Sequence, residues 1–391
     1  MIIKNAYVLN DEFHFVHADV YTDGRIITAI RMAGTAGAAE EPEQEIIDAY
    51  GSYLIPGLID IHSHGAVGCD HLDGAIESTS AICQYMAAKG TTSILATIMT
   101  QSCEKMENAC RNVAEYNGKL RDGAHVRGIY LEGPFFTEKY KGAQHPDYLM
   151  DANIDFFKKM YTLSGGLIKI ISLSPERQGS EEFTKEVLSD KDFSPVRVFI
   201  GHTDSDFDTA NSVIEAGASG LTHTFNGMRP LHHRNPGVLA ACLNNSKVFC
   251  ECICDGIHVH PAMIKFLYDH IGRDRFVIVS DSIQPAGLED GKYTSGGQEV
   301  TVKNNIAYLG LPGDSIQNST IAGSTACLYD SVMNLVRWDI ATLEDSVYAA
   351  SAMPAKAAGI YDHVGSISVG KAADLLIVSK NLELNHVIIS K

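Results

Sequence analysis

The sequence predicts an α/β protein, a (β/α)8 TIM barrel with a small β-sandwich domain built from the N- and C-terminal segments. Two observations lead to this fold class. In the middle of the chain, apolar runs of strand length alternate with segments of helical period, as in parallel strands joined by crossover helices. At both ends of the chain, short alternating runs replace that pattern, as expected for hairpins.

The terminal segments are expected to form short strands and turns. Near the N-terminus, the turn Thr22-Asp23-Gly24 separates alternating apolar runs. The stretch near residues 33–45 is acidic and rich in Ala and Gly, so an exposed loop is expected there. A turn at 370–374 and an apolar run at 375–378 repeat the strand pattern near the C-terminus. We therefore expect residues 1–55 and 360–391 to form the β-sandwich domain together.

Eight strands are expected in the central part of the chain. The apolar runs that predict them are 58–61, 93–98, 126–131, 167–172, 196–200, 219–222, 248–254 and 276–280. Segments of helical period lie at 78–89, 103–116, 207–216 and 262–271, and a glycine follows the first, third and fourth of these, which is a common signal for a helix end. Eight such units, with crossovers long enough for parallel pairing, predict a TIM barrel.

Residues 286–320 interrupt this pattern after the eighth strand. Paired glycines at 296 and 297, with short runs at 291–293, 300–302 and 306–309, predict a β-hairpin insertion there. Helices near 324–337 and 343–350 then complete the barrel, so that residues 56–359 form the barrel domain.

Composition and charge limit the possible functions. The chain has 391 residues, of which 31 are basic and 48 acidic, giving a net charge of −17. A protein this acidic does not attract nucleic acid or an anionic membrane through its overall field. Nine scattered cysteines fit a reducing compartment better than a disulfide framework. Because the sequence also has no signal-peptide pattern and no apolar run near the ~20 residues of a membrane span, we expect a cytoplasmic protein.

The predicted C-terminal ends of the strands carry residues of the types that bind metals and transfer protons. In a TIM barrel, catalytic groups lie at these ends. Six of the eight predicted strands end in such residues, which are His62 and His64, Glu132, His202, His223, Asp255 with His258, and Asp281. Chance placement of so many ligand-type residues at one face is not expected, so the sequence predicts a metal site there.

The pattern of these residues suggests a pair of divalent ions. His62 and His64 are two positions apart, so both project to the same side of an extended strand. Four imidazoles and one carboxylate can hold one or two divalent ions, and Glu132 is the carboxylate placed to bridge a pair. Asp281 is the natural general base, because it can take a proton from water whose pKa a metal lowers towards about 7.

Other candidate residues have simpler explanations. A lone histidine is more often a core or surface residue than a ligand, and we assign this role to His14, His17, His71, His125, His270, His363 and His386. Cys250, Cys252 and Cys254 share one face of a strand; they could form a soft metal site, but small buried residues fit better. Lys169 lies in the middle of the fourth predicted strand, which argues against a carboxylated bridging lysine.

Several motifs resemble those of a known family. The segment Pro56-Gly-Leu-Ile-Asp-Ile-His62-Ser-His64-Gly65 resembles the first-strand signature of the amidohydrolase superfamily, and 365–375 resembles its closing β-sandwich segment. Within the superfamily, the chain is similar to the N-acetylglucosamine-6-phosphate deacetylases. The matching blocks, in the family's order, are 131–135, 141–143, 173–176, 201–203, 222–228, 255–258, 280–281 and 321–324.

The resemblance implies hydrolysis of the N-acetyl group of N-acetylglucosamine 6-phosphate, giving glucosamine 6-phosphate and acetate in amino-sugar catabolism. It implies that Glu132, His202 and His223 bind a metal, that Asp281 is catalytic, and that His62 and His64 bind a second ion. Zinc or iron is expected, with manganese or cobalt as alternatives. The residues that the resemblance implies for substrate binding are Ala143, Gln144, Asn226, Gly227, Arg234, Asp255, His258, Ile321, Ala322 and Gly323.

The resemblance also implies a homodimer, in which phosphate contacts such as that of Arg234 can cross the interface. A local cluster of positive groups could then bind a phosphate ester in an acidic protein. One position departs from the family pattern: Gln144 stands where some members have a histidine that contacts the acetamide carbonyl. An amide N–H can donate to a developing oxyanion without a full charge, and a second metal could supply the remaining polarisation.

Alternative functions remain open from the sequence. N-acetylgalactosamine 6-phosphate differs from the expected substrate only in the orientation of one hydroxyl, which sequence reasoning does not resolve. A cyclic-amide hydrolase would usually need a bridging lysine after the fourth strand, where this chain has Ser172 to Ser174. A non-catalytic metal-binding homologue would not need Asp281 in addition to five ligand-type residues.

Overall fold

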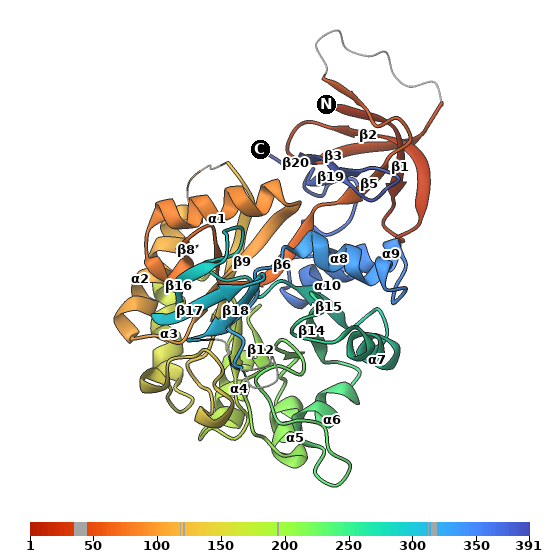
Figure 1. Ribbon diagram of the computed structural model, residues 1–391. Coiled ribbons are helices and arrows are strands. Elements are labelled where there is room, and N and C mark those ends of the chain that lie inside the picture. The colour runs from red at the N-terminus through yellow and green to blue at the C-terminus, as the bar shows by residue number, and fades with distance from the viewer. Residues whose placement is uncertain (35–44, 118, 120–121, 194, 312, 314–318) are drawn as a thin grey trace.

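The computed structural model describes residues 1–34, 45–117, 119, 122–193, 195–311, 313 and 319–391. Its central feature is a sheet of eight parallel strands in the order β15-β14-β13-β12-β11-β10-β9-β6 (Figure 1). A parallel bridge between Ser63 and Ser282 connects the two ends of this sheet into a nearly closed barrel. The strands are β6 (Leu58–Ser63), β9 (Thr91–Met99), β10 (His125–Glu132), β11 (Ile168–Leu173), β12 (Arg197–Ile200), β13 (Gly220–Leu221), β14 (Phe249–Ile253) and β15 (Phe276–Val279).

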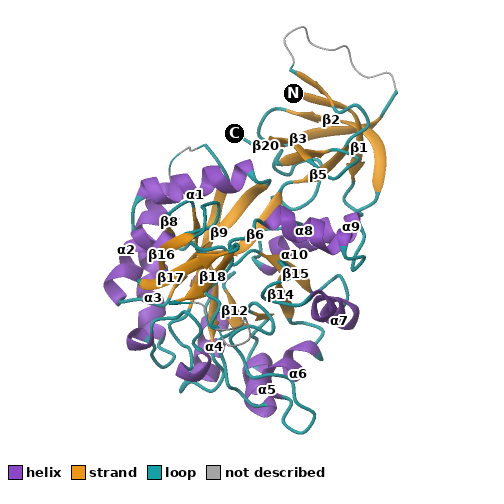
Figure 2. Ribbon diagram, in the orientation of Figure 1, coloured by secondary structure: helices purple, strands orange, loops and turns teal. Residues whose placement is uncertain are grey.

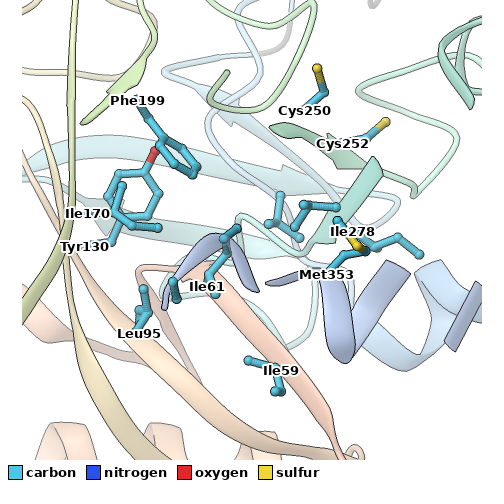
Figure 3. Packing of buried hydrophobic residues seen from close by; sticks show 14 of the residues in the cluster. Ile59, Ile61, Leu95, Tyr130, Ile170, Phe199, Cys250, Cys252, Ile278 and Met353 are labelled. Atoms are coloured by element: carbon cyan, nitrogen blue, oxygen red, sulfur yellow. The ribbon is translucent and has the colours of Figure 1, made fainter. Parts of the chain in front are cut away.

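The barrel strands are apolar because both of their faces are covered. Every residue of β6 and β9 is buried, as expected for parallel strands between an interior core and an outer layer of helices. Figure 3 shows part of this core, in which Ile59, Ile61, Leu95 and Tyr130 lie among other buried side chains. Packing of this kind fixes the strand ends, and therefore the side chains that follow them.

The helices surround the barrel strands (Figure 2). Several begin at side-chain caps: Asn153, Asp206 and Thr342 accept hydrogen bonds from backbone N–H groups in the first turns of α3, α5 and α9, which stabilises a helix start. The α-helices are α1 (Ile76–Ala88), α2 (Cys103–Asn117), α3 (Ile154–Leu163), α4 (Ser180–Ser189), α5 (Phe207–Glu215), α6 (Gly237–Leu243), α7 (Pro261–Ile271), α8 (Leu328–Arg337), α9 (Leu343–Ala350) and α10 (Ala352–Ala357). None of the helices in the described ranges has the length and apolar character that crossing a membrane requires.

A second sheet combines strands from both ends of the chain (Figure 1). Its order is β20-β19-β5-β1-β2-β3, and β4 pairs with β1. The antiparallel pairing of β5 with β19 joins the N-terminal and C-terminal parts, and the sheet has its own buried cluster, which includes Ile3, Val8 and Leu54. The strands are β1 (Ile2–Leu9), β2 (Phe15–Thr22), β3 (Ile27–Met32), β4 (Ile46–Asp48), β5 (Tyr53–Pro56), β19 (Leu375–Val378) and β20 (Leu384–Ile388).

The predicted fold class, a TIM barrel with a separate β-layer from the termini, is therefore confirmed. The division into domains at 55/56 and 359/360 stays a prediction. Most of the loop expected near 33–45 lies outside the described residues.

The insertion after the eighth barrel strand has one strand more than the predicted hairpin. It is a three-stranded antiparallel sheet of β16 (Gly291–Ser295), β17 (Gln298–Lys303) and β18 (Ile306–Leu309). Asn304 and Asn305 have φ of 54° and 59°, the backbone of a tight turn between twisted strands. This second turn sends the chain back and adds the third strand.

The helix expected near 324–337 also begins later than predicted, at Leu328. The preceding segment is held by pairing instead: Ser324 N–H donates to the carbonyl of Asp281 at 2.7 Å, and Ser324 forms a bridge with Ser282. These backbone hydrogen bonds continue the line of the eighth strand, so the segment cannot be helical.

Candidate metal centre and active site

The ends of the barrel strands bring the predicted metal ligands together. His62 lies within β6 and His64 just after it, Glu132 ends β10, and His202 and His223 each lie two residues beyond β12 and β13. All five are buried, with at most 6% of any one exposed. Residues up to 161 positions apart in the chain (62 to 223) therefore meet at one end of the barrel.

Three of the site residues have a left-handed backbone. The φ angles of His202, His223 and Asp281 are 45°, 30° and 49°, a conformation that costs a non-glycine residue about 1–3 kcal/mol. Hydrogen bonds hold these turns. The Ser174 hydroxyl donates to the carbonyl of His202 at 2.7 Å, and Asp281 N–H donates to the carbonyl of His62 at 2.9 Å. The local strain is offset by contacts with neighbouring strand ends.

One group of three ligand atoms has the spacing of a metal site. Nε2 of His202 and Nε2 of His223 lie 3.1 and 3.0 Å from Oε1 of Glu132, and 3.1 Å from each other. Tetrahedral ligands at about 2.0–2.1 Å from an ion would be roughly 3.3 Å apart. Two ring nitrogens and a carboxylate oxygen converging this closely fit a divalent cation between them.

A second group shares Glu132 with the first. Nε2 of His62 lies 3.5 Å from Oε1 of Glu132, and Nε2 of His64 lies 3.4 Å from Oε2. The ligand atoms within each group lie within 4.8 Å of one another. Because Glu132 belongs to both groups, the residues present fit a bridging carboxylate between two ions.

Asp281 faces the second group from the end of β15, the strand that neighbours β6 where the barrel closes. Its Oδ1 lies 3.5 Å from Nε2 of His62 and 3.2 Å from Nε2 of His64. Burial by itself would raise the pKa of this carboxyl, but the neighbouring His62 and His64 hold the pKa below its usual range. Asp281 is therefore ionised at neutral pH, as a proton acceptor must be.

A backbone carbonyl and a side-chain carboxylate contact two of the ligands from behind. Nδ1 of His202 lies 2.9 Å from the carbonyl oxygen of Tyr140, and Nδ1 of His62 lies 2.9 Å from Oε2 of Glu251. The sequence reasoning missed Glu251. One feature of the sequence indicates it: Glu251 is the single carboxylate within the apolar run 248–254, where a charged residue requires a partner.

A cavity of ≈ 290 Å³ opens beside the two groups. Met99 and Ser295, which the sequence analysis did not select, also line it. His62, Arg234 and Asp255 are not among the lining residues. The predicted site residues that line it are His64, Glu132, Ala143, Gln144, His202, His223, Asn226, Gly227, His258, Asp281, Ile321, Ala322 and Gly323.

Two of the predicted substrate-binding residues lie away from this cavity. Asp255 lies behind His258: its Oδ2 is 2.7 Å from Nδ1 of His258, and its Oδ1 accepts hydrogen bonds from the N–H groups of Ile257 and His258. Asp255 therefore orients His258, which does line the cavity. Arg234 is exposed, and its guanidinium contacts the ring of His233 at 2.8 Å.

Gln144 has both ends of its amide engaged. Its oxygen accepts a hydrogen bond from Thr100 N–H at 2.8 Å, and its nitrogen donates to Oε2 of Glu132 at 2.5 Å. The structure thus places Gln144 as a support for the shared carboxylate. A hydrogen bond to an oxyanion would have to use the second N–H of the amide, so that role stays a prediction.

The residues set aside in the sequence analysis lie outside both groups. His71 is buried without a hydrogen-bond partner for its ring among the described residues, and burial lowers its pKa to about 3. Cys250, Cys252 and Cys254 are buried free thiols, and burial raises the pKa of Cys250 to about 12, as for unreactive core cysteines.

Comparison with known proteins gives the following similarities. Residues 53–390 match the model of the amidohydrolase family. The chain is 35% identical to the N-acetylglucosamine-6-phosphate deacetylase of Bacillus subtilis (strain 168) over 386 residues, which cover 98% of this chain and 91% of that protein. It is 31% identical to the N-acetylgalactosamine-6-phosphate deacetylase of Escherichia coli O157:H7 over 359 residues, 92% of each chain.

A solved structure is also similar over the whole chain. It is a mutant of the N-acetyl-D-glucosamine-6-phosphate deacetylase of Mycobacterium smegmatis in complex with N-acetyl-D-glucosamine-6-phosphate. The TM-score is 0.88 at 25% sequence identity, with 100% of this chain and 98% of that chain covered.

Proposed function

This chain belongs to the amidohydrolase family and is a hydrolytic enzyme, and we propose that it hydrolyses the N-acetyl group of N-acetylglucosamine 6-phosphate to glucosamine 6-phosphate and acetate. The observation that carries this proposal is the cavity in which two ligand groups share Glu132 and Asp281 faces one of them at His64. The relative named for the glucosamine substrate is 35% identical, against 31% for the relative named for the galactosamine epimer.

The two ligand groups are proposed to hold one divalent ion each, zinc or iron, with manganese or cobalt as alternatives. Glu132, His202 and His223 would hold one ion, and His62, His64 and Glu132 the other. When bound, such ions lower the pKa of water and polarise an amide carbonyl. The shared carboxylate of Glu132 fits this arrangement, because its Oε1 lies near ring nitrogens of both groups and its Oε2 lies near His64.

Asp281 supplies the proton transfers in this reaction. As an ionised carboxylate next to His64, it takes a proton from the attacking water and delivers that proton to the departing amine nitrogen. The C–N bond of the amide breaks, the former water oxygen remains in acetate, and the amine leaves with the transferred proton. No covalent intermediate with the chain is needed.

The rest of the cavity is proposed to position the sugar and its phosphate. His258, held by Asp255, and the backbone segment 321–323 line the wall, so binding energy away from the reacting carbon fixes its position. Arg234 is exposed and does not line the cavity, so its proposed phosphate contact would be made across the interface of a homodimer. Nine free thiols support a cytoplasmic enzyme.

An acetate-release assay tests the proposal. The protein is reconstituted with Zn²⁺ or Fe²⁺ and offered N-acetylglucosamine, N-acetylgalactosamine and the 6-phosphate of each. We expect the highest kcat/KM for N-acetylglucosamine 6-phosphate. Higher kcat/KM for the galactosamine ester would favour the epimer, and no release from any of the four would overturn the proposal. The variant Asp281→Asn is the matched control: it should bind metal but lose turnover by about 10²–10⁴.

A further inference from the structure

Glu251 is a buried carboxylate in the interior of the barrel wall. It lies in β14 with 0% of its surface exposed, between Cys250 and Cys252. Figure 3 shows these two cysteines within the apolar packing. Because successive residues of a strand point to opposite faces, Glu251 projects to the other side of the strand, and burial of its charge requires compensation.

The partners of this buried carboxylate belong to both metal-ligand groups. Oε2 of Glu251 lies 2.9 Å from Nδ1 of His62 and accepts the N–H of His223 at 3.0 Å. His62 belongs to one ligand group and His223 to the other. The backbone carbonyl of Glu251 also accepts the N–H of Thr224 at 2.8 Å. One residue of β14 therefore contacts ligands from two different strands, His62 within β6 and His223 just after β13.

The contact with His62 determines which ring nitrogen is free. A carboxylate oxygen accepts hydrogen bonds, so Nδ1 of His62 is the donor in its contact with Glu251. Nε2 is then the ring nitrogen left for a metal, and it faces Glu132 and Asp281, at 3.5 Å from each. A carboxylate behind a ligand imidazole fixes the orientation of the ring and raises its basicity as a metal ligand.

The contact with His223 acts on the backbone. His223 has a φ of 30°, a strained conformation. The hydrogen bond from its N–H to Glu251, together with that from the N–H of Thr224, holds the turn that aims Nε2 of His223 at Glu132. Without the carboxylate, this buried N–H would lose its acceptor.

We propose that Glu251 is a positioning residue that joins the two metal sites, by fixing the His62 ring with Nε2 free and by holding the turn at His223. The proposal rests on the binuclear site of the proposed function, although it does not depend on the substrate. It is therefore tested by metal binding rather than by turnover.

The test measures the affinity and stoichiometry of Zn²⁺. Metal-free wild-type protein and the variants Glu251→Gln, Glu251→Leu and His62→Asn are titrated with Zn²⁺ in the presence of a competing chelator, and bound zinc is counted by mass spectrometry. In Glu251→Gln, the amide can keep its oxygen between His62 and His223, with its NH₂ group in place of Oε1, which has no partner within the described ranges. The second ion is the one proposed to be held by His62, His64 and Glu132. We expect this ion to bind about tenfold more weakly in Glu251→Gln and about 100-fold more weakly in Glu251→Leu.

Two further variants separate positioning from a general loss of stability. Cys252→Ala removes a buried side chain from the other face of the same strand and should leave both zinc affinities within about twofold. In the double variant Glu251→Leu with His62→Asn, the effects on the second ion should not add, because Glu251 acts through His62.

Particular results would overturn the proposal. These are two ions bound with unchanged affinity by Glu251→Gln and Glu251→Leu, additive effects in the double variant, or a single ion in the wild type. If Glu251→Leu does not fold, Glu251→Gln alone decides. A protein that binds two ions but releases no acetate would refute the proposed substrate and leave the role of Glu251 standing.

Discussion

At the scale of single residues, the site depends on side chains that hold other side chains. Glu132 makes contact with His202, His223, His62 and His64. Burial by itself would raise the pKa of this carboxyl, but His202, His223 and His62 hold the pKa well below its usual range. A carboxylate with so many partners needs a fixed orientation. Gln144 supplies part of that orientation, because its amide bridges Thr100 and Glu132.

The substitution Gln144→Ala tests this support. Removal of the amide leaves Oε2 of Glu132 without the donor at 2.5 Å, so the carboxylate can rotate away from its shared position. We expect about tenfold weaker zinc binding, together with a lower kcat, measured by chelator competition and acetate release. A fall in kcat at unchanged zinc affinity would instead assign Gln144 to the oxyanion.

The metal ligands could be predicted from the sequence, but the residues that hold those ligands in position could not. His62, His64, Glu132, His202 and His223 were found because strand ends at one face of a barrel can be located from apolar runs. Glu251 and Thr100 act through contacts between strands whose register no local pattern specifies. The left-handed turns at His202, His223 and Asp281 also carry no local signal, since non-glycine residues of any type adopt them only occasionally.

At the scale of elements, the segment after the insertion forms one wall of the site. Ser324 pairs with Asp281 and Ser282, which places Gly323 against the catalytic turn. Gly323 has a φ of 57°, and a Cβ there would lie 2.5 Å from Cγ2 of Ile283 and 2.9 Å from the carbonyl oxygen of Asp281. The wall can approach Asp281 this closely only because position 323 is glycine.

The substitution Gly323→Ala should therefore displace Asp281. The added methyl group meets backbone and a branched side chain, so we expect kcat to fall by at least about tenfold, because a small misplacement of the proton acceptor is costly. Gly310→Ala is the matched control, since Gly310 has a φ of 73° but nothing within 4 Å of a Cβ. It should lose about 1–2 kcal/mol of stability from the backbone alone and keep its kcat. Equal activity of the two variants would contradict the predicted contact.

The insertion shows where prediction from local pattern stops. Its turn at Gly296-Gly297 and the alternating runs beside it indicate strands, but the third strand depends on the left-handed pair Asn304-Asn305. Asparagine is permissive at such positions without requiring them. The late start of α8 has a similar cause, because the bridge between Ser282 and Ser324 is a tertiary contact that overrides helix propensity.

At the scale of the whole molecule, an acidic chain must accept a phosphate ester. The net charge is −17, yet the proposed site gathers its positive groups locally: divalent ions, His258 on the cavity wall and, across a dimer interface, Arg234. Local charges at a few ångströms outweigh distant ones that solvent screens over about 8–10 Å. The overall charge thus argues against nucleic acid more strongly than against a small anionic substrate.

The substitution Arg234→Ala tests the dimer part of this account. Loss of one charge-assisted hydrogen bond to phosphate corresponds to about 1.5–3 kcal/mol, so KM for N-acetylglucosamine 6-phosphate should rise about 10–100-fold. KM for unphosphorylated N-acetylglucosamine should not change. The exposed Arg337 provides the control variant Arg337→Ala, with no expected effect. A rise confined to the phosphate ester in a protein that sediments as a monomer would contradict the contact across an interface.

Metal removal is expected to lower the stability of the whole chain. The Nε2 atoms of His202 and His223 lie 3.1 Å apart beside a buried carboxylate, a spacing that fits a shared cation. An ion that binds only the folded chain stabilises it by mass action, by about 4 kcal/mol at 1,000 times its Kd. Calorimetry of chelator-treated and Zn²⁺-reconstituted protein should therefore show a Tm higher by several degrees with metal. Glu132→Gln, which weakens the ligand that both groups share, should lose most of this shift. An unchanged Tm after verified removal of all metal would show that the ligand residues are held by the barrel alone.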